Sequence, residues 1–239
     1  MKVFDPIQFP VIGVMHSPFH EKFGIPRQPN LVDVESYIEF HSPYNDLSAF
    51  EGIEEFSHLW LLWNFHENKQ ASSSKFRPQV RPPRLGGNEK KGIFATRSMY
   101  RPAPIGMSVV KRVRVEKCKN TVRLYVTGSD LLHGTPILDI KPYIVYSDAV
   151  TEALSGYAMD EPNKKTVIWE SVAKHQQEIL LRENQLTPKI IHSIEQVLSL
   201  DPRPAYQNDE QRIYGMKFDI FDVRFKVICD YIYIVEIIT

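Results

Sequence analysis

The chain has 239 residues, of which 43% are hydrophobic, and its 29 Lys and Arg residues balance 29 Asp and Glu residues. These values predict a soluble globular protein with a substantial core, built as one large domain or as a main domain with a smaller second one. No stretch approaches the roughly 18 unbroken apolar residues of a membrane helix, and the N-terminus lacks the layout of a signal peptide, so we expect a cytoplasmic protein.

The charges are distributed unevenly along the chain. Residues 75–117 contain 12 Lys or Arg against 2 Asp or Glu, a balance of +10, whereas residues 1–74 have a balance of −6 and residues 118–239 one of −4. A basic block of this size suits a polyanion, because Lys and Arg that contact phosphates release counterions. The alternative is a solvated charged face.

The first elements are a strand and a long loop. Residues 10–19 form an apolar run followed by Ser-Pro, which predicts a strand that ends near His16. Residues 20–31 contain a glycine, two prolines and no periodicity, and loops of this length in compact domains are often functional. Arg27 and Gln28 lie at the centre of this loop.

Two further strands are expected before the basic block. Residues 37–40 form a short one, and residues 51–68 begin acidic and become a dense apolar run, which predicts a buried strand. His66 and Glu67 follow where this apolar run stops, at a place where polar groups can emerge into a cleft. Residues 71–74 are small and predict a flexible tether.

The stretch Lys90–Lys117 combines a short strand, a proline-stiffened loop and a longer strand. Pro102 and Pro104 fix φ, so the loop can hold its shape without support from a helix or a sheet. Residues 107–115 alternate, which predicts a strand whose odd-numbered residues are buried and whose even-numbered residues form a mostly basic face. Residues 121–127 alternate in the same way and should pair with this strand as a hairpin.

After about residue 147, the spacing of apolar residues changes from the alternation of strands to the intervals of helices. Residues 166–181 have apolar residues at helical intervals, and residues 187–200 form a clearer helix with Thr187 as its cap and Pro188 at its first position. Residues 213–238 predict three strands, with Cys229 on the same face of the middle strand as its apolar residues. A helix packed on a three-stranded meander would form a small second domain.

Several common sites are excluded. Residues 87–94 have the glycine spacing of a phosphate loop but lack its Lys and Ser/Thr, and no GxGxxG or GxSxG motif is present. Pro18 opposes a helix that would bring His16 and His20 to one metal ion, and the two distant cysteines indicate no zinc site, so no metal is expected.

The densest cluster of titratable residue types lies around two turns at residues 130–143. Its members are Asp130, His133, Asp139, Lys141 and Tyr143. From residue types alone, the turn-forming role of Asp130 and a solvated Lys141 are favoured over a catalytic role.

Five ordered motifs resemble the TrmO family, also called TsaA-like or YaeB-like. They are PRQ at 26–28, WNFHEN at 63–68, RPPRLGG at 81–87, GIFATRSMYRPAPIGMS at 92–108 and LLHGTPILDIKPY at 131–143. DPRPAY at 201–206 is similar to the full-length bacterial members. The family consists of S-adenosylmethionine-dependent methyltransferases that modify N6-threonylcarbamoyladenosine next to the anticodon of tRNA.

The resemblance implies a mainly β fold, with a single-sheet, non-Rossmann β-barrel over residues 6–147 and an α+β domain over residues 148–239. It also implies homodimers that complete the cofactor site and the tRNA anticodon stem-loop as partner. By similarity, the cofactor is surrounded by Pro26, Arg27, Gln28, His66, Glu67, Arg97, Leu131, Asp139, Ile140, Lys141 and Pro142. The RNA would be faced by Arg81, Arg84, Lys90, Lys91, Arg101, Arg112 and Arg114.

Methyl transfer to N6 needs a base, because the lone pair of this urea-type nitrogen is delocalised. Asp139 and Tyr143 are the candidates, and Arg101 or Lys141 is expected to pair with the threonyl carboxylate of the substrate. Two alternatives stay open, a non-enzymatic RNA-binding barrel and a methyltransferase with a different RNA target.

Overall fold

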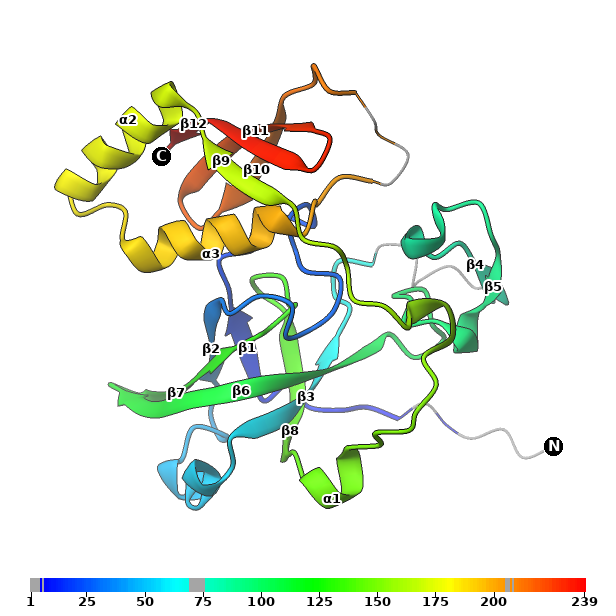
Figure 1. Ribbon diagram of the computed structural model, residues 1–239. Coiled ribbons are helices and arrows are strands. Elements are labelled where there is room, and N and C mark those ends of the chain that lie inside the picture. The colour runs from blue at the N-terminus through cyan, green and yellow to red at the C-terminus, as the bar shows by residue number, and fades with distance from the viewer. Residues whose placement is uncertain (1–4, 6, 69–75, 205–206, 208) are drawn as a thin grey trace.

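The computed structural model describes residues 5, 7–68, 76–204, 207 and 209–239. The flexible tether predicted at residues 71–74 lies outside these described residues. The chain forms a sheet of six strands, a second sheet covered by two helices, and a small hairpin beside the first sheet (Figure 1). Among the described residues, no helix is long and apolar enough to span a membrane.

The first sheet closes on itself as a six-stranded barrel in the order β1-β2-β7-β6-β3-β8, in which β1 also pairs with β8. All of its neighbouring strands are antiparallel. The strands are β1 (Gly13–His16), β2 (Glu35–Phe40), β3 (His58–Asn64), β6 (Ile105–Cys118), β7 (Thr121–Thr127) and β8 (Pro136–Pro142). Alternate side chains such as Leu59 and Leu61 fill the interior. The mainly β prediction is confirmed.

The predicted faces of strand β6 are wrong in its first half. Ser108 and Val110 point into the barrel with 1% and 0% exposure, whereas Met107 is 54% exposed. The inner position needs a small residue because the Trp63 indole fills this part of the barrel and donates to the Ser108 hydroxyl at 3.1 Å. A register shift near Arg112 then interrupts the alternation.

A hairpin subdomain with little regular structure lies beside the barrel. It contains β4 (Gln79–Val80) and β5 (Lys91–Gly92), which pair antiparallel.

Short 3₁₀ helices occur at several places along the described chain. They are η1 (Leu47–Phe50), η2 (Ile53–Glu55), η3 (Pro83–Leu85), η4 (Ile93–Ala95) and η5 (Gly156–Ala158).

The C-terminal part is a four-stranded sheet in the order β10-β11-β12-β9. Its elements, after the single turn α1 (Val145–Asp148), are β9 (Thr166–Trp169), α2 (Ser171–Arg182), α3 (Pro188–Ser199), β10 (Tyr214–Phe218), β11 (Phe221–Ile228) and β12 (Tyr231–Ile238). The three-stranded meander is confirmed as β10-β11-β12. The α3 helix is confirmed together with its cap, since Thr187 accepts a hydrogen bond from the Ile190 amide at 3.2 Å.

Two predictions for this part need correction. The helix expected at 166–181 is present as α2 from Ser171 onward, but its first residues form β9 instead. Strand β9 pairs parallel with β12, and β-branched Thr166, Val167 and Ile168 suit a strand. Cys229 lies in the turn after β11 with φ of 50°, and it is exposed.

The loop before β2 joins the two parts of the molecule. The barrel has its own core, but three side chains of this N-terminal segment, those of Phe19, Val32 and Val34, belong to the core of the C-terminal sheet and helices. Helix α3 lies between the C-terminal sheet and the barrel (Figure 1), and Lys189 on it forms an ion pair with Glu35 at 2.8 Å. The C-terminal part therefore packs directly on the loop that contains the PRQ motif.

Candidate active site

A cleft of about 520 Å³ opens at one end of the barrel. It is bounded by the loop before β2, the end of β3, the stretch before β6 and the loop between β7 and β8. The lining residues are Lys22, Ile25–Pro29, Trp63, Phe65–Glu67, Thr96, Arg97, Met99, Arg101, Ile105–Met107, Asp130, Leu132 and Thr135. Charged groups of both signs therefore face one partly apolar space.

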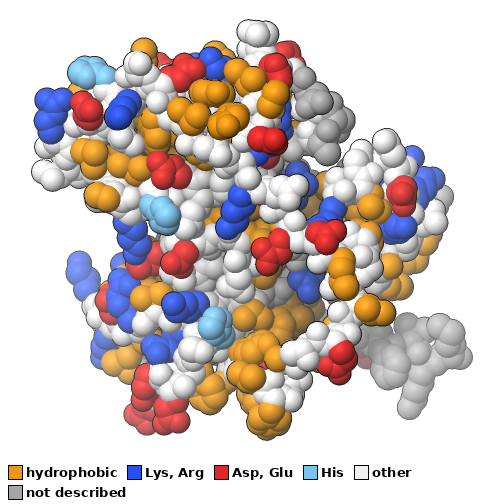
Figure 2. Space-filling model, in the orientation of Figure 1, with side chains coloured by type: hydrophobic (Ala, Val, Ile, Leu, Met, Phe, Trp, Pro, Cys, Tyr) orange, Lys and Arg blue, Asp and Glu red, His pale blue; other side chains and the backbone are white. Residues whose placement is uncertain are grey.

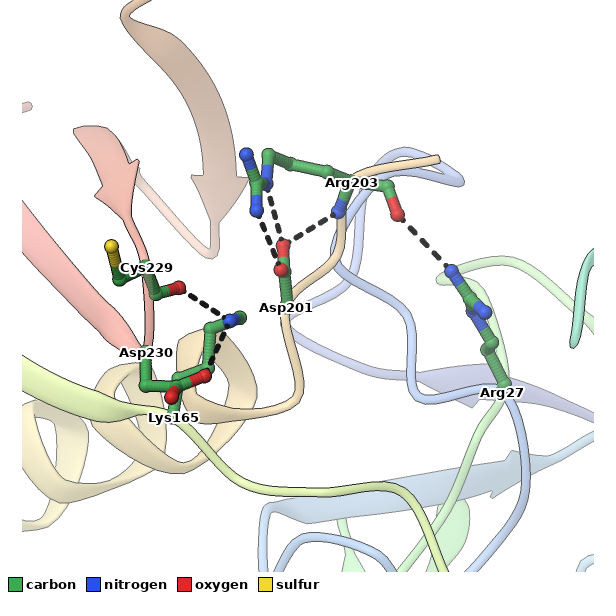
Figure 3. A network of polar contacts seen from close by, with 6 residues as sticks. All are labelled: Arg27, Lys165, Asp201, Arg203, Cys229 and Asp230. Atoms are coloured by element: carbon green, nitrogen blue, oxygen red, sulfur yellow. Dashed lines mark hydrogen bonds and ion pairs between the residues drawn. The ribbon is translucent and has the colours of Figure 1, made fainter. Parts of the chain in front are cut away.

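The PRQ loop is held in place from both parts of the molecule. The Asn30 side chain donates to the Val109 carbonyl of the barrel at 3.0 Å. The Arg27 guanidinium donates to the Arg203 carbonyl of the C-terminal part at 3.1 Å (Figure 3). Within the cleft, Arg97 donates to the Gln28 side-chain oxygen at 2.6 Å. Arg27 and Arg97 are thus fixed relative to each other through this loop.

The Arg203 carbonyl is itself oriented by a partly buried ion pair. The Arg203 guanidinium donates two hydrogen bonds of 2.9 Å to Asp201, as Figure 3 shows. Burial alone would raise the pKa of Asp201, but the hydrogen bonds and charge of Arg203 outweigh it and hold this pKa below its usual range. Nearby, Lys165 donates to the Cys229 carbonyl at 2.6 Å, which ties the start of β9 to the β11–β12 turn (Figure 3).

Asparagines at the end of β3 hold the proline-rich loop. Asn64 donates to the Pro104 carbonyl at 3.3 Å and Asn68 donates to the Met99 carbonyl at 2.7 Å. Arg101 donates to the Thr96 carbonyl, so its guanidinium stays at the cleft wall. The loop therefore keeps its shape through side-chain hydrogen bonds in addition to its prolines.

Asp130 is the innermost carboxylate of the cleft. Its Oδ1 accepts a 2.6 Å hydrogen bond from the Ser108 hydroxyl, which in turn accepts from the Trp63 indole. Burial raises the pKa of Asp130 to about 6, although the Ser108 hydrogen bond and the Arg97 charge act in the opposite direction. Glycine is required at position 106, beside the Trp63 indole, because a Cβ there would lie 2.3 Å from this ring.

The structure brings most of the expected cofactor residues together, but not all. Pro26, Arg27, Gln28, His66, Glu67 and Arg97 line the cleft. Leu131 is 1% exposed and belongs to the barrel core, and Asp139 to Pro142 lie in strand β8, outside the cleft lining. Asp139 and cleft-lining Met107 both pair with Leu62, so they share the outer face, two strand spacings or about 10 Å apart.

The candidate bases from the sequence lie on that outer face. Asp139 forms a 2.7 Å ion pair with Lys141. The Tyr143 ring packs at 5.8 Å from the Trp60 ring and at 6.4 Å from that of His58. Neither Asp139 nor Tyr143 lines the cleft of this chain. Sequence reasoning favoured a turn role for Asp130, because only the fold reveals its burial and its contact with Ser108, 22 residues earlier.

The expected RNA-facing residues lie in three places, the hairpin subdomain, the cleft and strand β6. Arg81, Arg84, Lys90 and Lys91 belong to the hairpin subdomain, where Figure 2 shows Lys and Arg side chains near the exposed edge. Arg84 also donates to the Asp160 carbonyl, and Lys91 lies 3.1 Å from Glu89. Arg101 lines the cleft.

The two arginines of β6 are engaged elsewhere on the barrel. Arg112 donates to the carbonyls of Phe56 and Glu54, each at 2.8 Å. The Arg114 guanidinium lies 3.6 Å from the centre of the Tyr125 ring and pairs with Glu116. Their hydrogen bonds support the packing of the barrel.

The fold and the cleft define a non-Rossmann barrel protein with a mixed-charge pocket for a small ligand beside a basic surface. Among the described residues, no group of three His, Cys, Asp or Glu side chains is arranged to hold a metal ion. Residues 14–149 match the family model described as the tRNA-methyltransferase O N-terminal domain, and residues 162–239 match the TrmO C-terminal domain. The chain belongs to the tRNA-methyltransferase O family.

Individual relatives agree with this membership. A tRNA (adenine(37)-N6)-methyltransferase of Escherichia coli strain K12 is 41% identical over 223 residues, which cover 92% of this chain and 93% of the relative. A Pseudomonas aeruginosa relative whose name refers to S-adenosylmethionine-dependent methyl transfer is 45% identical over 89% of both chains. The crystal structure of TrmO from Pseudomonas aeruginosa matches with a TM-score of 0.78 and 34% identity, covering 98% of this chain and 99% of that one.

Proposed function

We propose that this chain is an S-adenosylmethionine-dependent methyltransferase that methylates N6 of threonylcarbamoyladenosine next to the anticodon of tRNA. The observation that carries the proposal is the match of both family models, together with a cleft lined by the PRQ, His66-Glu67 and Arg97 motif positions. S-adenosylmethionine would supply an electrophilic methyl group on a positively charged sulfur.

The cleft fits such a cofactor in size and chemistry. A volume of about 520 Å³ lies within the range of small-molecule sites. Arg27 and Arg97 are suited to a carboxylate, Glu67 to positive charge, and apolar Phe65 to the adenine ring. Along the outer face beyond Met107, Asp139, Ile140, Lys141 and Pro142 would extend this site, and buried Leu131 would support its floor.

Several groups are proposed to recognise tRNA. Arg81, Arg84, Lys90 and Lys91 would meet the phosphates of the anticodon stem-loop, with Arg112 and Arg114 contributing at the far end of β6. Arg101, which lines the cleft, is better placed than Lys141 to pair with the threonyl carboxylate. Losses of tRNA affinity in Arg101→Ala that are equal on tRNA with and without the threonyl group would dismiss this pairing.

The proposed organisation is a cytoplasmic homodimer of two-domain chains, with domains at residues 6–147 and 148–239. The bounds of the two family models and the two separate cores support the division. Exposed apolar side chains around α1, those of Ile144, Val145 and Val150, support self-association, and apolar groups are visible there in Figure 2. Light scattering that gives a monomer mass at working concentrations would rule the dimer out.

A cofactor titration separates the methyltransferase from a non-enzymatic RNA-binding barrel. The wild-type chain is expected to bind S-adenosylmethionine in calorimetry and to lose affinity on Arg97→Ala, because Arg97 fixes Gln28 in the cleft. Arg114→Ala, in the second half of β6 and outside the cleft lining, is the matched control and should bind normally. Binding of tRNA without any cofactor binding would favour the module. Methyl transfer to RNA that lacks threonylcarbamoyladenosine would favour a different target.

A further inference from the structure

Three side chains that line the cleft carry potential bases, and they differ in their surroundings. His66 and Glu67 are exposed at the rim, where the Lys22 ammonium also lies 3.0 Å from the Glu67 carbonyl. Asp130 lies deeper and is partly buried, and its neighbours Ser129 and Leu131 are both 1% exposed. A base that acts on a nitrogen inside the cleft must reach past the rim, and Asp130 meets this condition.

The hydrogen bonds around Asp130 have a fixed direction. The Trp63 indole nitrogen is only a donor, so the Ser108 oxygen accepts from it at 3.1 Å and its single proton points to Asp130 Oδ1 at 2.6 Å. The Trp63 indole packs closely against Gly106, where a side chain would leave it no room. Ser108 therefore donates to the carboxylate, and Asp130 is held as an acceptor.

The environment also suits the charge state that a base needs. Burial raises the pKa of Asp130 to about 6, and Ser108 and the Arg97 charge limit this rise. At neutral pH the carboxylate is ionised, yet it binds a proton more strongly than an exposed aspartate does. A general base is most effective when its pKa is close to the working pH.

We propose that Asp130 is a catalytic residue of the methyl transfer and accepts the proton of the substrate N6, and that Ser108 is the positioning residue that holds its carboxylate. This inference rests on the proposed function. As the N6 lone pair forms its bond to the methyl carbon, the electron pair of the breaking carbon–sulfur bond stays on sulfur, and the N6 proton passes to Asp130. The neutral carboxyl then returns the proton to solvent.

The test compares Asp130→Asn with Asp139→Asn, which removes the same charge on the outer face. For Asp130→Asn we expect methyl transfer to tRNA to fall at least about a hundredfold, with S-adenosylmethionine and tRNA affinities within about threefold of wild type. The rising limb of the wild-type pH–rate profile near pH 6 should be absent from the residual activity. Asp139→Asn should keep that limb. Ser108→Ala should show a smaller loss and a shifted limb at unchanged cofactor affinity.

A readout without turnover accompanies these rates. Infrared titration of the unliganded protein is expected to show a carboxyl that ionises near pH 6 in wild type and Asp139→Asn but is missing in Asp130→Asn. Full turnover in Asp130→Asn overturns the inference and leaves the proposed function intact. A loss of cofactor affinity as large as the loss of rate also overturns it, by making Asp130 a binding group. A wild-type chain that transfers no methyl group to tRNA overturns both.

Discussion

Replacing Asp130 by asparagine should stabilise the folded protein at neutral pH. The carboxylate is ionised there at the cost of burial, which raises its pKa above the ordinary value of 3.8. The amide of Asp130→Asn has no charge to desolvate, and its oxygen can still accept the hydrogen bond from Ser108. A gain in stability at an active-site position is typical of groups that are retained for function.

The size of this effect follows from the two pKa values. Because the folded pKa of about 6 lies above 3.8, the unfolded state releases this proton first as the pH rises, and wild type loses stability between those values. The full loss is about 3 kcal/mol, since each pH unit of pKa difference is worth about 1.4 kcal/mol. About 2 kcal/mol of it should develop between pH 4.5 and pH 8.

Urea unfolding of wild type and Asp130→Asn across this pH range measures the difference directly. All other titrating groups are shared, so the gap between the two free energies of unfolding should widen with pH and level off above about pH 7. Asp139→Asn serves as the control, because it removes a carboxylate of the same size from the outer face, where the side chain is 46% exposed. A constant gap between wild type and Asp130→Asn would refute the buried, ionised carboxylate.

Three further changes test other parts of the structure. Asp201→Ala leaves the buried Arg203 guanidinium unpaired and should cost about 3 kcal/mol in urea unfolding, and a cost near zero would contradict the pair. Gly106→Ala forces its Cβ against the Trp63 indole and should cost about 1–3 kcal/mol with a changed tryptophan fluorescence spectrum; an unchanged spectrum and stability would refute the close contact. Phe94→Ala removes a ring that is 72% exposed beside the basic hairpin and should lower tRNA affinity about tenfold in filter binding without changing its salt dependence, whereas equal affinity would exclude base stacking there.

Periodicity was sufficient to predict the elements that are long and regularly patterned. The alternation around β7 and the cap and stripe of α3 each correspond to an element in the structure. Alternation did not assign the faces of β6, because the inner position next to Trp63 requires the small, polar Ser108. It also missed β9, a short strand whose pairing partner β12 lies about 65 residues later in the chain.

The candidate site was predicted in part. Motif positions before β2 and after β3 line one cleft, as their place in loops at strand ends favours. Asp130 could not be selected from the sequence, since an aspartate after a glycine and a serine has the signature of a turn. Its burial depends on Ser108 from another strand, and the Arg27 contact depends on the distant Arg203.

Nucleoside mass analysis of tRNA incubated with this protein and S-adenosylmethionine measures the proposed methyl transfer itself. We expect threonylcarbamoyladenosine to gain one methyl group on N6 and tRNA lacking this nucleoside to gain none. Unchanged threonylcarbamoyladenosine in the presence of bound cofactor, or a methyl group at another nucleoside, would contradict it.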